Sequence, residues 1–224
     1  MGMPISIDIP ASKTEADFEP AFGLLRKIDE QFSTYIPDSE VSRYARGELT
    51  KTSPKLTRII KACKKYQAET DGYFSAWAAG TFDPSGYVKG WAIDEAGELI
   101  QKAGFGTYCI GAGGDILAKS DGNKVWKIGI QDPLASGKIL DLLSISNGAV
   151  ATSGNYERGE HIINPKTKKP ANELLSVTVT GPDMIKADVW ATAIFARGQQ
   201  NTIKPAPDYR VVVVTRSNKI YKYG

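Results

Sequence analysis

The order of the expected secondary-structure elements constrains the fold of this chain more than any other feature. Helix-type patterns come first, closely spaced strand-type runs follow between residues 107 and 154, and one more helix precedes a C-terminal hairpin. The helical patterns cover residues 14–32, 53–72, 82–104 and 184–198. A chain of βαβ units would instead place a helix between successive strands. The order therefore predicts one α+β domain over residues 1–224, with a mixed or antiparallel sheet packed by about four helices.

Local signals mark several element ends. Ser53 and Pro54 are typical of the N-cap and first position of a helix, and Gly198 is typical of a residue that ends one. Residues 3–9, "MPISIDI", alternate between apolar and polar side chains and predict an edge-type strand. Residues 33–44, "STYIPDSEVSRY", are rich in turn formers and predict a loop.

The composition excludes several classes of protein. With 42% hydrophobic and 24% charged residues and a formal charge of +3, the chain is expected to be globular and not to bind nucleic acid. Cys63 and Cys109 stand alone, without the spacing of a zinc or iron–sulfur site. No apolar run reaches the length of a membrane span, and residues 1–10 lack the basic-then-apolar layout of a signal peptide. We expect a cytoplasmic protein, the alternative being an exported or lipid-anchored one whose leader has been removed.

The glycine-rich stretch "GAGGDI" (111–116) follows a strand-type run and is the natural place to test for dinucleotide binding. A Rossmann fingerprint needs its glycines to open a helix, whereas here another strand-type run follows. The stretch instead predicts a tight turn at which the backbone comes close to a ligand or to another strand.

A carboxylate and a hydroxyl share one face of the last expected helix. Asp188 and Thr192 are four residues apart, and an oxygen-only pair suits Mg²⁺ better than zinc or copper. The alternative is that Asp188 lies in the first turn and favours the helix dipole while Thr192 packs. In the turn "DPSGYVKG" (83–90), backbone carbonyls could complete a metal site and Lys89 could neutralise a phosphate, although a solvated lysine is the local alternative.

Seven stretches in a fixed order carry a resemblance to a known family. They are "IDEQFSTYIPDSEVSR", "TDGYF", "DPSGYVKGWAID", "GAGGDI", "VATSGNYER", "HIINP" and "ADVWATA", between residues 28 and 193. In this respect the chain resembles the ApbE family of flavin transferases, which move FMN from FAD onto a protein threonine or serine. The resemblance implies an ApbE-like fold, related to the T-fold, and a short member of the family.

The resemblance also implies roles for individual positions. Asp188 and Thr192 match side-chain magnesium ligands, and Gly86 and Ala191 match backbone ones. The positions that match residues near the FAD are Ser33, Thr34, Tyr35, Tyr73, Phe74, Asp83, Lys89 and Ile162. His161, the single histidine of the chain, matches the histidine at the reacting centre, where a neutral imidazole suits a general base. Asp188 is counted with it among the catalytic residues.

The implied activity is a Mg²⁺-dependent transfer of FMN to a hydroxyl of an acceptor flavoprotein with a Ser/Thr-containing motif, with release of AMP. Hydrolysis of FAD to FMN and AMP, or flavin binding without catalysis, are the alternatives. The chain departs from the family pattern at Ser75, Asn164 and Lys168, which replace Asp, Asp and Gly, and in a shortened segment before "DPSG".

Overall fold

The computed structural model describes residues 2–135, 137–155, 162–198 and 208–224. The described helices are α1 (Glu19–Phe32), α2 (Glu40–Ala45), α3 (Pro54–Glu69), α4 (Ser85–Lys102) and α5 (Met184–Arg197), with a short 3₁₀ turn at Glu15–Asp17. The strands are β1 (Ile5–Asp8), β2 (Tyr108–Ala112), β3 (Asp115–Lys119), β4 (Trp126–Gln131), β5 (Ile139–Ile145), β6 (Gly148–Gly154), β7 (Ile163–Asn164), β8 (Lys169–Pro170), β9 (Leu174–Gly181), β10 (Arg210–Thr215) and β11 (Ile220–Tyr223).

One seven-stranded sheet organises the protein, in the order β1-β2-β3-β6-β9-β10-β11. Every described pair of strands in it is antiparallel, and β4 pairs with β5, and β7 with β8, in two smaller sheets. The predicted α+β class and antiparallel sheet are confirmed, and β1 lies at the edge as its alternating sequence predicts.

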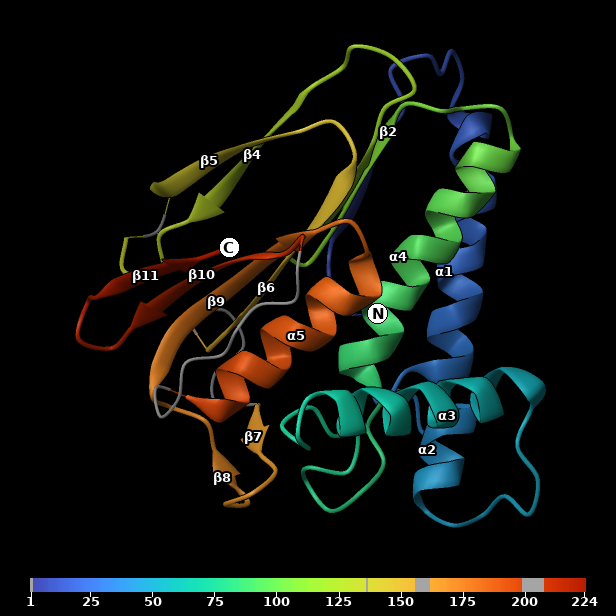
Figure 1. The fold of residues 1–224 in the computed structure, drawn as a ribbon. Coiled ribbons are helices and arrows are strands. Elements are labelled where there is room, and N and C mark those ends of the chain that lie inside the picture. The colour runs from blue at the N-terminus through green and yellow to red at the C-terminus, as the bar shows by residue number, and fades with distance from the viewer. Residues whose placement is uncertain (1, 136, 156–161, 199–207) are drawn as a thin grey trace.

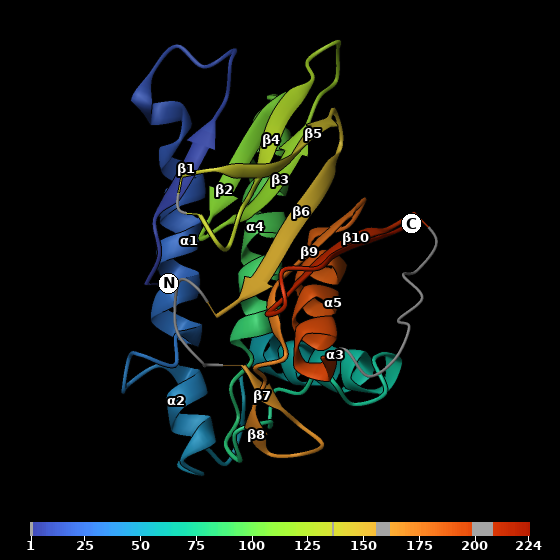
Figure 2. The same cartoon turned by 90° about the vertical axis from the view of Figure 1, so that its left-hand side faces the viewer.

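The sheet has helices on one face and a hairpin on the other (Figure 1). Helix α4 packs against both α1 and α5, and α4 and α5 also contact the sheet, because each of the three helices buries an apolar stripe in the shared core. On α1 this stripe is Ala21, Leu25, Ile28 and Phe32, at helical spacing. Figure 2 shows the β4–β5 hairpin over the opposite face, where Trp126 and Ile128 pack on Ala118 and Val150.

The predicted helix ends are confirmed where local chemistry specified them. The Ser53 hydroxyl accepts a hydrogen bond from the Leu56 backbone at 3.1 Å, and Pro54 is the first residue of α3. The N-cap of α5 is Asp183, and Gly198 follows the last turn with a φ of 76°. "GAGGDI" forms the β2–β3 hairpin, in which Gly113 and Gly114 both have positive φ, as a two-residue turn between twisted strands requires.

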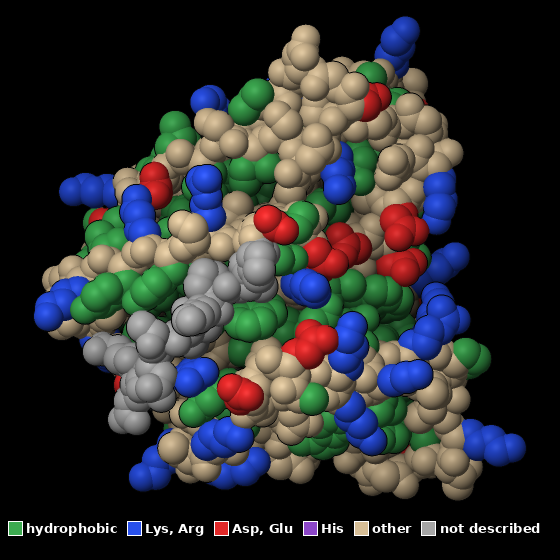
Figure 3. Space-filling model, viewed as in Figure 1, with side chains coloured by type: hydrophobic (Ala, Val, Ile, Leu, Met, Phe, Trp, Pro, Cys, Tyr) green, Lys and Arg blue, Asp and Glu red, His purple; other side chains and the backbone are tan. Residues whose placement is uncertain are grey.

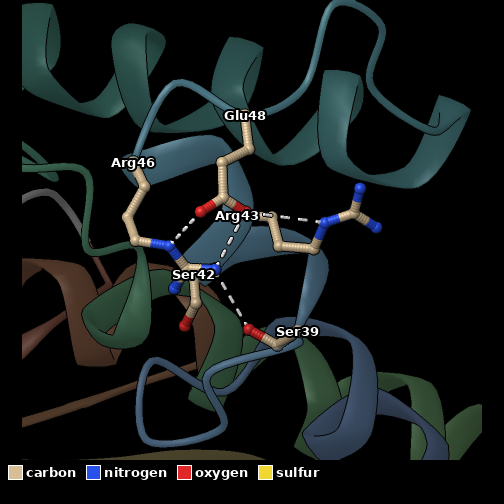
Figure 4. A network of polar contacts seen from close by, with 5 residues as sticks. All are labelled: Ser39, Ser42, Arg43, Arg46 and Glu48. Atoms are coloured by element: carbon tan, nitrogen blue, oxygen red, sulfur yellow. Dashed lines mark hydrogen bonds and ion pairs between the residues drawn. The ribbon is translucent and has the colours of Figure 1, made fainter.

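Two expectations need correction. The stretch 33–44 is not all loop, because Ser39 caps the short helix α2 and accepts a hydrogen bond from the Ser42 backbone at 3.0 Å (Figure 4). Salt bridges from Arg43 and Arg46 to Glu48 lie beside this cap. The "DPSGYVKG" turn is already helical from Ser85, so its carbonyls begin a helix instead of standing free.

Both cysteines are free, Cys63 buried and Cys109 partly buried. Among the described residues, no helix is long and apolar enough to cross a membrane. On the face shown in Figure 3, basic and acidic side chains are interspersed, in keeping with the small net charge.

Candidate active site

A cavity of 320 Å³ lies between the N-terminal turn of α4, the loop after α1, and the ends of β6 and β7. Of the thirteen residues singled out from the sequence, eleven are a described part of its lining. They are Ser33, Thr34, Tyr35, Tyr73, Phe74, Asp83, Gly86, Lys89, Ile162, Asp188 and Thr192. Residues from five separate parts of the chain are therefore brought to one place, and its volume is in the range of small-ligand sites.

The loop Ser33–Tyr35 is held at the cavity by the cap of α2. The Ser39 hydroxyl, which is almost fully buried, donates a 2.7 Å hydrogen bond to the Ser33 carbonyl while its oxygen caps the helix. The Tyr35 backbone N–H also bonds to the Ser33 hydroxyl at 3.3 Å. The Tyr35 side chain remains 82% exposed, so its ring is accessible at the rim of the cavity.

Lys89 joins two buried carboxylates at the inner end of the cavity. Its Nζ atom lies 2.5 Å from Oδ2 of Asp115 and 3.5 Å from Oδ1 of Asp188. Asp115 is fully buried and Asp188 is 3% exposed. Of the described side chains, these two carboxylates and one ammonium together carry a formal charge of −1, which attracts a cation or a proton.

The surroundings of Asp188 determine the pKa of its carboxyl group and leave one of its oxygens without a hydrogen bond. Burial raises the pKa of Asp188, Lys89 opposes the rise, and the neighbouring Asp115 carboxylate adds to it. The second oxygen of Asp188, Oδ2, is buried without a hydrogen-bond partner. Since buried polar atoms are nearly always paired, this oxygen is suited to bind a ligand.

Small residues on α4 let α5 come close enough to share the site. At Gly86 a methyl group would lie 3.6 Å from Oγ1 of Thr192, and at Gly90 it would lie 3.1 Å from the Ile185 backbone. The Thr192 hydroxyl lies 3.3 Å from the hydroxyl of Ser153, on β6. Gly86, Thr192 and Asp188 are thus neighbours, as the predicted magnesium site requires.

The residues present fit a hard divalent cation. The donors at this point are a carboxylate oxygen without a partner and a hydroxyl, the ligand types that Mg²⁺ takes, while phosphate oxygens and water usually complete its shell. Within the described ranges, no group of three or more His, Cys, Asp and Glu side chains could hold a metal. Ala191 is fully buried in α5 and is not part of the cavity lining, so its proposed backbone role stays a prediction.

The other residues that the resemblance places near the FAD have different surroundings in the cavity. Phe74 and Ile162 are both buried and form part of the apolar wall of the cavity. Asp83 accepts a 2.9 Å hydrogen bond from the backbone of Ser85, the first residue of α4. Tyr73 is flanked by two cations, with Nζ of Lys166 at 5.6 Å and Cζ of Arg197 at 5.1 Å from its ring centre.

His161 lies outside the described residues. The described residues on either side of residues 156–161 are next to the cavity, since Gly154 and Ile162 both line it. The departure Lys168 has a φ of 59°, a left-handed conformation that explains why the family pattern has glycine there.

The sequence reasoning missed two polar residues of this site. The sequence places Asp115 in a predicted tight turn and assigns no role to Ser153. Asp115 could have been found, because it begins a strand-type run of mostly apolar residues. A carboxylate that is buried in such a strand requires a charged partner. No local pattern marks Ser153, which reaches the site because β6 lies under α5.

Comparison with known proteins agrees with this fold and site. The sequence model of the ApbE family matches residues 1–81 and 77–210, so the chain belongs to the ApbE family. The structure is similar to "Flavin Transferase ApbE from Vibrio cholerae", with a TM-score of 0.84, 22% identity, and coverage of 100% of this chain and 94% of that one. An ApbE protein from Thermotoga maritima also has a TM-score of 0.84, at 22% identity, with 99% and 93% covered.

Curated relatives carry the name "FAD:protein FMN transferase". The one from Rhodobacter capsulatus is 28% identical over 216 residues, which cover 92% of this chain and 40% of that protein. The one from Haemophilus influenzae is 28% identical over 296 residues, which cover 97% of this chain and 85% of that protein. The chain thus spans less than half of the first relative and most of the second.

Proposed function

We propose that residues 1–224 form one flavin-transferase unit that moves FMN from FAD to a Ser or Thr hydroxyl of an acceptor protein. The reaction needs Mg²⁺ and releases AMP. The observation that carries the proposal is the cavity itself, in which an unpartnered buried carboxylate oxygen, a hydroxyl and a lysine meet beside aromatic wall residues. The names of the relatives support the same chemistry.

Different residues of the cavity would bind the cation and the pyrophosphate of FAD. Asp188 and Thr192 would hold the cation, and Gly86, which the resemblance assigns a backbone oxygen, lies beside Thr192. Lys89 would neutralise part of the pyrophosphate charge as a point charge. Bound Mg²⁺ would supply charge stabilisation on the phosphoryl oxygens.

Transfer then requires one bond to form and one to break. The acceptor oxygen attacks the phosphorus atom on the FMN side, the P–O–P bridge breaks, and AMP leaves with the bridging oxygen. The acceptor hydroxyl loses its proton, and we assign His161 as the base that takes it. Such assistance is worth about 10²–10⁴ in rate, so His161→Ala should lower turnover more than FAD binding.

The test is to incubate the protein with FAD, Mg²⁺ and an acceptor domain that carries a Ser/Thr flavinylation motif. AMP release together with a flavin mass increase on the acceptor supports the proposal. AMP with free FMN would indicate FAD hydrolysis instead, and bound FAD without AMP would indicate a binding module. Absence of FAD binding would refute the proposal altogether.

Thr192→Val gives a matched variant, because valine has nearly the shape of threonine and lacks its hydroxyl. We expect it to fold and to need more Mg²⁺ for the same rate. As the control, Thr167→Val makes the same change on the exposed β7–β8 turn and should leave the Mg²⁺ requirement unchanged.

A further inference from the structure

The Lys89 ammonium lies beside the oxygen pair that would bind the cation, and this raises the question of why it does not neutralise the site. Of the two carboxylates, Asp115 is the nearer to its Nζ atom, at 2.5 Å, while Asp188 lies at 3.5 Å. Asp115 comes from β3, directly after the Gly113–Gly114 turn, on the sheet side of the cavity. Asp115, which has no assigned role in the chemistry, therefore holds the lysine more closely than Asp188 does.

Asp115 is itself fixed in place. Its Oδ1 atom accepts a 3.0 Å hydrogen bond from the backbone of Thr152 on β6, and its side chain is fully buried. Its second oxygen, Oδ2, is the one that contacts Lys89. Two neighbouring strands thus set the position of this carboxylate, and a buried charge in such a place persists only with a charged partner.

We propose that Asp115 is a positioning residue, which binds the Lys89 ammonium and thereby keeps the charge of Asp188 for a divalent cation. This inference rests on the proposed function and extends it to a residue of the β2–β3 hairpin. With Asp115 present, the lysine is neutralised and the cluster keeps a charge of −1. Without the Asp115 charge, Lys89 and Asp188 form a neutral pair, and Mg²⁺ must compete with the ammonium for the carboxylate.

The test is Mg²⁺ binding to the flavin-free protein, measured by isothermal titration calorimetry. Asp115→Asn keeps the size of the side chain and an oxygen that can accept from Thr152. We expect about tenfold weaker Mg²⁺ binding or worse, because unit charges a few Å apart interact appreciably even at the effective dielectric of a protein. In the transfer assay the Mg²⁺ concentration for half-maximal rate should rise while the rate at saturating Mg²⁺ stays near the parent value.

A double variant shows whether Asp115 acts through Lys89. Lys89→Gln combined with Asp115→Asn removes both partners, leaves no unpaired buried charge between them, and restores the cluster charge of −1. Mg²⁺ affinity should return to within about threefold of the parent. If the double variant binds Mg²⁺ as weakly as Asp115→Asn, the residue acts on the metal directly or on the framework, and the inference is wrong.

A control and a second comparison complete the test. Asp141→Asn makes the same chemical change at an ion pair with Lys222, away from the cavity, and should leave Mg²⁺ binding unaltered. Unchanged Mg²⁺ affinity in Asp115→Asn would overturn the inference while leaving the proposed function intact. Failure of the parent protein to bind Mg²⁺ would refute the metal component of the proposed function and, with it, this inference.

Discussion

Replacing Asp188 with asparagine should stabilise the metal-free protein while abolishing the Mg²⁺-dependent activity proposed above. The reason is the position of this carboxylate, which is 3% exposed and has one oxygen without a hydrogen-bond partner. Lys89 keeps its closer partner Asp115 when the Asp188 charge is removed, so no cation is left unpaired.

The magnitude follows from the ionisation of the side chain. Burial raises the pKa of Asp188 from 3.8 to about 7. A difference of about 3 between the folded and unfolded pKa corresponds to about 4 kcal/mol. The folded protein is destabilised by this amount at a pH at which the carboxylate is ionised both in the folded and in the unfolded chain. The amide would leave N–H groups unmatched in the same place, at a cost of about 1–3 kcal/mol. The expected net gain at pH 8 is about 1–3 kcal/mol.

The sign of the pH dependence provides a second readout. Because the folded pKa is above the unfolded one, Asp188 makes the parent less stable as the pH rises from about 4 to about 7. The advantage of Asp188→Asn should therefore be complete at pH 8 and smaller by about 2–3 kcal/mol at pH 5. Urea unfolding in EDTA, followed by tryptophan fluorescence at both pH values, measures this difference.

Asp141→Asn is the control, since that carboxylate is on the surface and its pKa is lowered by Lys222. If Asp188→Asn is less stable than the parent at pH 8 and has the same pH dependence of stability, ionisation of Asp188 does not destabilise the folded protein and the reasoning is wrong. Retention of Mg²⁺-dependent transfer by Asp188→Asn would show that this residue does not hold the metal.

Three further predictions concern the framework, each measured by urea unfolding. Lys168→Gly should raise the free energy of unfolding by about 0.5–1 kcal/mol, because the φ of 59° disfavours a side chain, and a lower value would contradict this. Asp94→Asn should stabilise the protein at pH 8 by up to about 4 kcal/mol and have little effect below pH 4, because burial raises the pKa of Asp94 to about 7. A change in the free energy of unfolding that is the same at both pH values would contradict this. Gly181→Ala should lower stability by about 1–3 kcal/mol, since its methyl group would overlap the buried ring of Tyr209, whereas Gly122→Ala, in open space, should be neutral.

The sequence alone determined the features that depend on neighbouring residues. Helix starts such as Ser53–Pro54 and the Gly113–Gly114 hairpin follow from local hydrogen bonding and from the backbone freedom of glycine, so they could be predicted without a fold. The same local reasoning failed at Ser39, because a six-residue helix is stabilised by its cap and by tertiary packing instead of by its own pattern.

The tertiary structure alone decided how the site residues meet. Spacing placed Asp188 and Thr192 on one helix face, but it left open whether that face was a metal site or ordinary packing. Only the antiparallel sheet, which brings β3 and β6 under α5, places the buried Asp115 against Lys89 and Ser153 against Thr192. The interaction of charges depends on distance in space and on burial, and neither can be read from separation along the chain.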